Sequence, residues 1–431
     1  MNPTKKRAAL HNLGCKVNQY ENELMCQRLM EAGYEITDFP GPAELVVINT
    51  CTVTNIADRK SRQMIHKARK LNPEAVIVAA GCYVQTGGSD EAADILIGNA
   101  DKVRIVEIID EYLKSGSASP APADPVCSSF TDEPLKTIGD RSRAFIKIQD
   151  GCNQFCTYCI IPYARGRVVS RSHEEIIEEV RGLAASGITE FVLTGIHISS
   201  YGYDLKHPGE KPLADRFEEE ELLKLMQELD ALPGVERLRL SSLEPRVITE
   251  SFTEGISKLK SICPHFHLSL QSGSASVLKR MNRHYSPEDF RERVKLLRRI
   301  FDDPAITTDI IAGFPGETEE EFAETLAFAE DIGFFEIHAF PYSRRAGTPA
   351  ASMEGQLTEA EKAERVKKLV ALSSRLSEDF RRRYDSREVE FLCEEIRGDK
   401  AVGHTREYIE LCIPARDMEP GSVIRLTKEP D

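Results

Sequence analysis

The sequence predicts an α/β protein in three parts: an open parallel sheet, a partial barrel of six strand–helix units, and a small antiparallel β-barrel at the carboxyl end. Strand and helix patterns alternate in two series, a Pro-rich stretch at 115–125 separates the series, and short strands bounded by turn residues end the chain. Alternation produces parallel sheets covered by helices, whereas short strands between turns produce antiparallel sheets. We predict domains at residues 3–114, 138–368 and 371–431, with a linker at 115–137.

The first series predicts the open sheet. Its strands are short apolar runs, at residues 8–13, 44–49, 75–80 and 93–97. Between them, apolar residues recur at helical spacing, which predicts helices at 19–32 and 57–71. Ligands of such sheets bind at the carboxyl ends of the strands, so the residues that follow each strand are candidates for a site.

The second series predicts the partial barrel. Its six strands are expected at 144–149, 191–194, 237–241, 265–270, 308–312 and 335–340. Helical patterns lie between them, at 173–185, 218–232, 287–301 and 318–332. A barrel of eight units needs about 250 residues or more, so six units fit this segment better.

The tail has a different pattern. A long charged helix is expected at 358–384, and short strands follow it, at 388–393, 401–402, 408–413 and 422–426. Short strands separated by turn residues indicate a small antiparallel barrel, to which the end of this helix leads.

Composition excludes several classes of protein. The 431 residues are 41% hydrophobic, which is enough to form cores and excludes a wholly disordered chain. No apolar run approaches the roughly 18 residues of a membrane helix, and the start of the chain is not a secretory signal. The net charge of −14 argues against indiscriminate nucleic-acid binding. Eleven cysteines point to a reducing cytoplasm, where cysteines bind metals or act in catalysis.

Cys152, Cys156 and Cys159 form a C-x3-C-x2-C motif directly after the first strand of the second series. Three thiolates on one loop can hold three corners of a [4Fe–4S] cluster and leave one iron open for a small molecule. Zinc is the alternative. It prefers four ligands, and His173 is the nearest candidate for the fourth.

Cys15, Cys51 and Cys82 are far apart in the sequence, yet each follows a predicted parallel strand. They therefore project from one edge of the sheet and can converge on a second three-ligand iron–sulfur cluster. The simpler interpretation is three buried structural cysteines. Five further cysteines are interpreted as structural or incidental: Cys26, Cys127, Cys263, Cys393 and Cys412.

Nearly the whole chain resembles the methylthiotransferase family of radical S-adenosylmethionine enzymes. The resemblance rests on these six cysteines and on the motifs GCNQFCTYCIIPYARGR at 151–167, LTGIHISSYG at 193–202, SSLEP at 241–245, LSLQSGSASVLKRMNR at 268–283 and DIIAGFPGETEEEF at 309–322. The tail is similar to the TRAM domain of RNA-modifying enzymes. The first two motifs are most similar to the branch that acts on N6-threonylcarbamoyladenosine beside the tRNA anticodon.

The resemblance implies two [4Fe–4S] clusters, held by the two cysteine triads, and two molecules of S-adenosylmethionine per turnover. A 5′-deoxyadenosyl radical would open the C–H bond at C2 of adenine, and the product would be 2-methylthio-N6-threonylcarbamoyladenosine. The residues that would bind S-adenosylmethionine lie beside the core triad or at the ends of barrel strands: Tyr158, Gly195, Ser241, Glu244 and Gln271.

The implied partner is tRNA, and we predict that basic residues near the triads hold phosphates of its anticodon arm. These residues are Arg62, Lys67, Arg69, Arg165 and Arg167. A small reducing flavoprotein or ferredoxin would supply electrons, and a monomer is expected. Two alternatives keep the chemistry but change the substrate, to N6-isopentenyladenosine in tRNA or to an aspartate of a ribosomal protein. An alternative of another class is a non-catalytic iron–sulfur or zinc protein that binds RNA.

Overall fold

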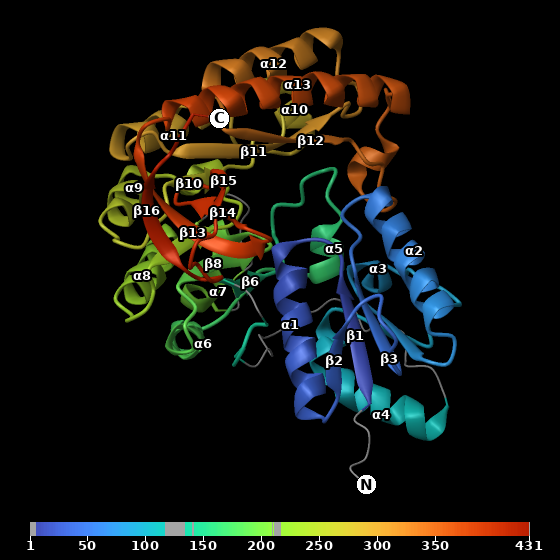
Figure 1. The fold of residues 1–431 in the computed structure, drawn as a ribbon. Coiled ribbons are helices and arrows are strands. Elements are labelled where there is room, and N and C mark those ends of the chain that lie inside the picture. Colours follow the sequence, from blue (N-terminus) through green and yellow to red (C-terminus); the bar gives the residue numbers. More distant parts are fainter. Residues whose placement is uncertain (1–5, 117–133, 140–141, 209, 211–216, 431) are drawn as a thin grey trace.

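The protein folds into three parts, each built on β-sheet with surrounding helices, and the computed structural model describes residues 6–116, 134–139, 142–208, 210 and 217–430 (Figure 1). The N-terminal part, in blue, and the C-terminal strands, in red, both lie against the central part (Figure 1). Most of the predicted linker, with Cys127, lies outside the described residues.

The N-terminal part is a five-stranded parallel sheet in the order β2-β1-β3-β4-β5. Its strands are β1 (Arg7–Asn12), β2 (Glu35–Asp38), β3 (Leu45–Thr50), β4 (Val76–Gly81) and β5 (Ile95–Ile97). Its helices are α1 (Lys16–Glu31), α2 (Asn55–Leu71), α3 (Cys82–Gln85), the 3-10 helix η1 (Ala100–Arg104) and α4 (Ile105–Ser115). All of β3 is buried, because its alternate residues pack into apolar clusters on opposite faces. The predicted open sheet is confirmed. The edge strand β2 is not among the predicted strands, because its sequence EITD is polar. The strand is incompletely buried.

The central part contains the six predicted parallel strands, so the partial barrel is confirmed. They are β6 (Arg143–Asp150), β8 (Glu190–Gly195), β9 (Arg237–Leu240), β10 (His265–His267), β11 (Ala305–Ala312) and β12 (Glu336–Pro341). Two parallel bridges, Leu238 to Ile262 and Leu243 to Leu268, join the first three strands to the last three. A two-residue strand, β7 (Val169–Ser170), pairs antiparallel with β6.

Helices connect these central strands. They are α5 (Ile161–Arg165), α6 (His173–Ala185), η2 (Ile198–Ser200), α7 (Tyr203–Lys206), α8 (Glu219–Asp230), η3 (Pro245–Val247), α9 (Glu250–Ser257), α10 (Ala275–Arg280), α11 (Pro287–Ile300), α12 (Glu319–Ile332) and η4 (Pro349–Ser352). Capping boxes fix the starts of α6, α11, α12 and α13 (Glu359–Arg383). The N-cap residues are Ser172, Ser286, Thr318 and Thr358. The predicted starts of these four helices are correct to within one residue.

The C-terminal part is a four-stranded antiparallel sheet in the order β15-β14-β13-β16, which confirms the predicted antiparallel strands. Its strands are β13 (Glu388–Arg397), β14 (Lys400–Thr405), β15 (Glu410–Pro414) and β16 (Val423–Thr427). A bulge between Cys393 and Glu395 bends β13. None of the helices in the described ranges is both long and apolar enough to cross a bilayer.

Two helices are shared between the three parts. α1 buries Leu29 against the N-terminal sheet, while its Tyr20 belongs to the large apolar core of the central part. α13 buries Leu369 in the central core and Phe380 against the C-terminal sheet. The division predicted at 368–371 therefore lies inside a helix that both parts use.

Candidate active site and metal centres

The three dispersed cysteines lie at one edge of the N-terminal sheet. Cys15 follows β1, Cys51 follows β3 and Cys82 follows β4, and these strands are neighbours in the sheet. All three cysteines line one cavity of about 640 Å³, whose walls come from all three parts of the protein. Cys51 and Cys82 are buried, and Cys15 is exposed to the cavity. The strand ends thus bring these residues together as predicted.

A glycine precedes a cysteine in each triad. Gly14, before Cys15, has a φ of +104°, and Gly151, before the core motif, has a φ of +70°. A Cβ on Gly14 would lie 2.9 Å from the Cys51 sulfur, and a Cβ on Gly151 would overlap the carbonyl of Arg167. Only glycine allows this backbone and leaves room for the sulfur. The Gly-Cys pairs are therefore a local sequence signal of both cysteine sites.

The core C-x3-C-x2-C motif forms the loop between β6 and α5. Cys156 is buried, and Cys159 lines the same cavity as the N-terminal triad. Thr157 donates two hydrogen bonds to backbone carbonyls at the end of α10, at 2.9 and 3.0 Å, which hold the loop. Arg283 donates to the Cys156 sulfur at 3.3 Å.

Burial keeps four of the six thiols protonated in the metal-free protein. It raises the pKa of Cys51 and of Cys159 to about 12, and it also raises the pKa of Cys15 and of Cys152. Protonated thiols are poor nucleophiles. A coordinated metal displaces such protons, so these groups suit metal binding rather than covalent catalysis.

The spacing of the sulfurs in each triad bears on the choice between an iron–sulfur cluster and a zinc ion. Among the described residues, only His267, Asp309 and His338 bring three possible ligand atoms within 4.8 Å of one another. At least two sulfurs of each triad are therefore farther apart. Two thiolates on one tetrahedral zinc lie about 3.8 Å apart, since Zn–S bonds are about 2.3 Å long. His173, the predicted fourth ligand, is hydrogen-bonded to Glu228 at 2.8 Å and does not line the cavity.

Four of the five predicted contacts to S-adenosylmethionine line the cavity: Tyr158, Gly195, Ser241 and Gln271. Among the described residues, the buried hydroxyl of Ser241 has no hydrogen-bond partner, so it is available to a polar ligand. Glu244 does not line the cavity, so its direct contact with S-adenosylmethionine stays a prediction. Its carboxylate accepts hydrogen bonds from Arg246 at 2.7 Å and Arg283 at 3.2 Å, so it positions the arginine that reaches the core triad.

Several cavity residues are not among the predicted contacts: Lys16, Arg143, Arg239, His265, His267 and Tyr408. Tyr408 lies in the turn between β14 and β15, so the C-terminal sheet contributes to the cavity wall. Its ring stacks on His265 with centroids 4.8 Å apart, and its hydroxyl accepts a hydrogen bond from Arg143 at 3.0 Å. These residues belong to no local motif, so only the folded structure brings them together.

Three of the five predicted RNA contacts are exposed: Arg62, Lys67 and Arg167. The guanidinium carbon of Arg167 lies 4.4 Å from the centre of the Phe155 ring, and that of Arg62 lies 5.9 Å from the Tyr83 ring. Cation–π contacts of this kind hold the charged groups at the surface, where a phosphate can reach them.

The other two predicted RNA contacts are engaged within the protein. Arg165 is buried and donates hydrogen bonds to Glu21 at 2.7 Å and Asp150 at 2.9 Å. Arg69 donates to Asp94 at 2.5 Å and to three backbone carbonyls. Both guanidinium groups thus have partners within the protein and stabilise the fold, and their predicted contact with phosphate stays a prediction.

The fold and the core triad define a radical SAM protein. Residues 146–329 match the family model described as Radical SAM superfamily, and residues 7–99 match Uncharacterized protein family UPF0004. The radical S-adenosylmethionine methyltransferase TsrM from Kitasatospora setae has a similar structure, with a TM-score of 0.57 and 16% identity over 80% of this chain and 77% of that chain. The cobalamin-dependent S-adenosylmethionine radical enzyme OxsB has a TM-score of 0.52 and 12% identity over 86% of this chain and 57% of that chain. These two likenesses concern the fold.

Curated relatives define the family more closely. The threonylcarbamoyladenosine tRNA methylthiotransferase MtaB of Bacillus subtilis is 41% identical over 429 residues, which are 97% of this chain and 92% of that protein. The protein of the same name from Aquifex aeolicus is 37% identical over 90% of this chain and 92% of its own length. The tRNA-2-methylthio-N(6)-dimethylallyladenosine synthase of Moorella thermoacetica is 34% identical over 96% and 93%, respectively. This chain belongs to the methylthiotransferase family of radical SAM enzymes.

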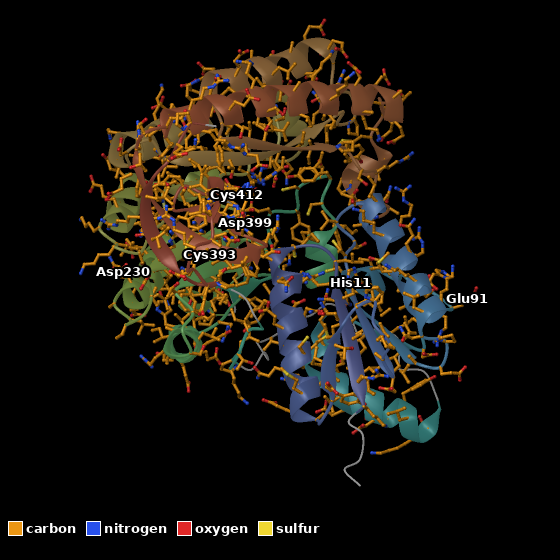
Figure 2. All side chains as sticks on the ribbon, viewed as in Figure 1. His11, Glu91, Asp230, Cys393, Asp399 and Cys412 are labelled. Carbon is orange, nitrogen blue, oxygen red and sulfur yellow. The ribbon has the colours of Figure 1, made fainter. Side chains whose placement is uncertain are left out.

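Iron content tests the assignment of two clusters. After anaerobic reconstitution with iron and sulfide, we expect about eight irons per chain, four for each triad. Replacing Cys15, Cys51 and Cys82 together with Ala should lower this to about four, and so should the matching replacement of the core triad. Cys412→Ala, on the C-terminal sheet (Figure 2), is the control and should retain about eight, because this exposed cysteine does not line the cavity.

Elemental analysis for iron, sulfide and zinc provides the measurement, with electron paramagnetic resonance of the reduced protein to identify the cluster type. Zinc in place of iron, or an undiminished iron content in either triple variant, would contradict the assignment.

Proposed function

We propose that this protein adds a methylthio group to C2 of N6-threonylcarbamoyladenosine next to the tRNA anticodon. The observation that carries the proposal is the single cavity reached by cysteines of both triads. Relatives named for this activity support it, at 36–41% identity over at least 90% of the chain. Relatives named for the dimethylallyladenosine substrate are 34–35% identical, which favours the threonylcarbamoyl substrate.

The donor groups around the cavity fit the cofactors of this reaction. The N-terminal triad and the core triad would each hold a [4Fe–4S] cluster, and Tyr158, Gly195, Ser241 and Gln271 would hold S-adenosylmethionine beside the core triad. When bound, these groups supply the radical and sulfur chemistry that no protein acid or base can provide. The unpartnered Ser241 hydroxyl and the three-sulfur donor sets support this fit.

The chain's own contribution is to position the reactants and to exclude water. A cavity of about 640 Å³ lies within the range of about 300–1,000 Å³ that is usual for ligand sites. Because its walls come from three parts of the protein, a base that enters it is enclosed on several sides. Enclosure orients the C2–H bond and protects a reactive intermediate from solvent.

We assign the phosphate contacts to the exposed residues Arg62, Lys67 and Arg167. Bases of the anticodon loop are single-stranded and can turn out into a pocket while basic side chains hold the phosphates. The C-terminal sheet is assigned a positioning role, because Arg406 donates hydrogen bonds to the carbonyls of Lys260 and Ile262, at 2.9 and 2.7 Å, and Tyr408 completes the cavity wall.

The remaining assignments follow from the chemistry. One-electron reduction requires a donor, which we assign to a small reducing flavoprotein or ferredoxin. A reducing cytoplasm keeps the cysteines available to iron, and we propose a monomer that acts there. We also retain the domain limits 3–114, 138–368 and 371–431, with α13 shared by the last two.

Nucleoside mass spectrometry tests the activity. In tRNA from a host that lacks its own methylthiotransferases, expression of this protein should produce 2-methylthio-N6-threonylcarbamoyladenosine. The control is the triple variant of the N-terminal triad, which should form no product, because it lacks the site assigned to sulfur transfer. Methylthiolation of the isopentenyl nucleoside would contradict the substrate, and unchanged tRNA with intact iron would direct the search to ribosomal protein.

Salt dependence tests the phosphate contacts. The combined variant Arg62→Ala, Lys67→Ala and Arg167→Ala should weaken tRNA binding, because three counterion-releasing contacts are lost. The slope of log K against log salt concentration should fall by about two to three in magnitude. Filter binding gives the slope when it is measured between 50 and 300 mM salt, since such contacts weaken over roughly this range.

Lys295→Ala is the matched control, since this exposed lysine lies on α11 and pairs with Glu292 at 2.8 Å. It should leave the slope unchanged. An unchanged slope in the triple variant would place the RNA elsewhere on the surface.

A further inference from the structure

The cavity contains a cation that the proposed function has not used. Lys16, the first residue of α1, lines the cavity beside Cys15. Within the described part of the chain, no hydrogen bond or ion pair engages its ammonium group. Lys16 is exposed to this cavity, so its charge is available to a ligand of opposite charge that enters.

The two neighbouring arginines are poorly suited to take that ligand, because most of their donors are used. Arg143 pairs with Glu190 at 3.1 Å and donates to Tyr408 at 3.0 Å. Arg239 donates to Glu190 at 3.0 Å and to two backbone carbonyls at 2.8 Å each. These arginines contribute positive charge to the cavity, and Lys16 contributes the free donor.

The charges around Lys16 favour an anion. Arg143 and Arg239 line the same cavity as Lys16 and add two further positive charges to its wall. The two carboxylates of the cavity wall, Asp309 and Glu336, are each paired with a histidine, at 3.2 and 3.6 Å. An anion bound to Lys16 would relieve the repulsion between like charges.

We propose that Lys16 binds the carboxylate of the threonylcarbamoyl group and thereby selects the substrate. This inference rests on the proposed function and deepens it, because it identifies the residue that recognises the substituent. A threonylcarbamoyl group carries one carboxylate, whereas a dimethylallyl group carries no charge. An ammonium–carboxylate hydrogen bond is charge-assisted and therefore strong. An apolar substituent would leave the ammonium group unpaired inside the cavity, which disfavours that substrate.

The test compares two variants on one tRNA in two forms. Lys16→Gln removes the charge and retains much of the length, and Lys16→Arg retains the charge. The reconstituted proteins are assayed with tRNA that carries N6-threonylcarbamoyladenosine and with the same tRNA that carries plain adenosine at that position. Dissociation constants are measured for both forms, and kcat/KM for methylthiolation is measured with the modified form.

We expect Lys16→Gln to weaken binding of the modified tRNA and to lower kcat/KM by about 10- to 100-fold, the effect of losing one charged hydrogen bond. Binding of the plain tRNA and the iron content should match those of the wild type, which also reports correct folding. Lys16→Arg should recover part of the loss.

Three results would overturn the inference. An equal loss with both tRNA forms would mean that Lys16 holds a backbone phosphate. Loss of S-adenosylmethionine cleavage in the absence of tRNA would mean that it holds the carboxylate of the cofactor. Loss of iron would mean that it supports the cluster.

The wild-type protein separates this inference from the proposed function. If it prefers the modified tRNA but forms no methylthio product, the proposed function fails, and the loss of that preference in Lys16→Gln still supports the subsite. If it forms the product but binds both tRNA forms equally, the subsite fails and the proposed function remains.

Discussion

The ion pair between Glu21 of α1 and Arg165 of α5 holds the two cysteine triads on one cavity. Arg165 donates to the Glu21 carboxylate at 2.7 and 3.0 Å, and Lys102 and Lys147 donate to it at 2.5 and 3.0 Å. Although burial alone would raise the pKa of Glu21, these three cations hold it well below its usual range. The pair joins the helix that follows the first cysteine of one triad to the helix that follows the last cysteine of the other. Breaking such a buried pair costs about 3–5 kcal/mol, because it leaves an uncompensated charge.

A second buried charge cluster closes the cavity from the C-terminal side. Glu190 pairs with Arg143, Arg237 and Arg239, and these arginines also bond to side chains or carbonyls of the C-terminal sheet. Burial alone would raise the pKa of Glu190, but the charges of Arg239 and Arg143 lower it to about 2. The carboxylate is therefore ionised at neutral pH, and the docked sheet brings Tyr408 into the cavity wall. Two charge clusters thus arrange three separate parts of the chain around one site before any ligand binds, as a positioning role in catalysis requires.

Strand order made the convergence of the dispersed cysteines predictable, because the carboxyl ends of parallel strands share one edge of a sheet. Partners that meet only through packing were not predictable. Arg165 has the sequence context of an RNA contact, and its pairing with Glu21 depends on how α1 packs against β6. Glu244 similarly follows a barrel strand, but its carboxylate accepts a hydrogen bond from Arg283 and does not line the cavity. Lys16 and Tyr408 were not singled out because neither carries a recognisable site motif. Both line a cavity that only the folded chain defines.

The central claim is that both triads hold clusters on the walls of one cavity. Anomalous diffraction at the iron absorption edge, from crystals of the anaerobically reconstituted protein, tests it most directly. We expect two separate iron peaks, one beside Cys51 and one beside Cys159, both bordering the cavity that Tyr158 lines. A single peak, or a second peak on the outer surface away from this cavity, would show that the two triads do not hold clusters on one cavity.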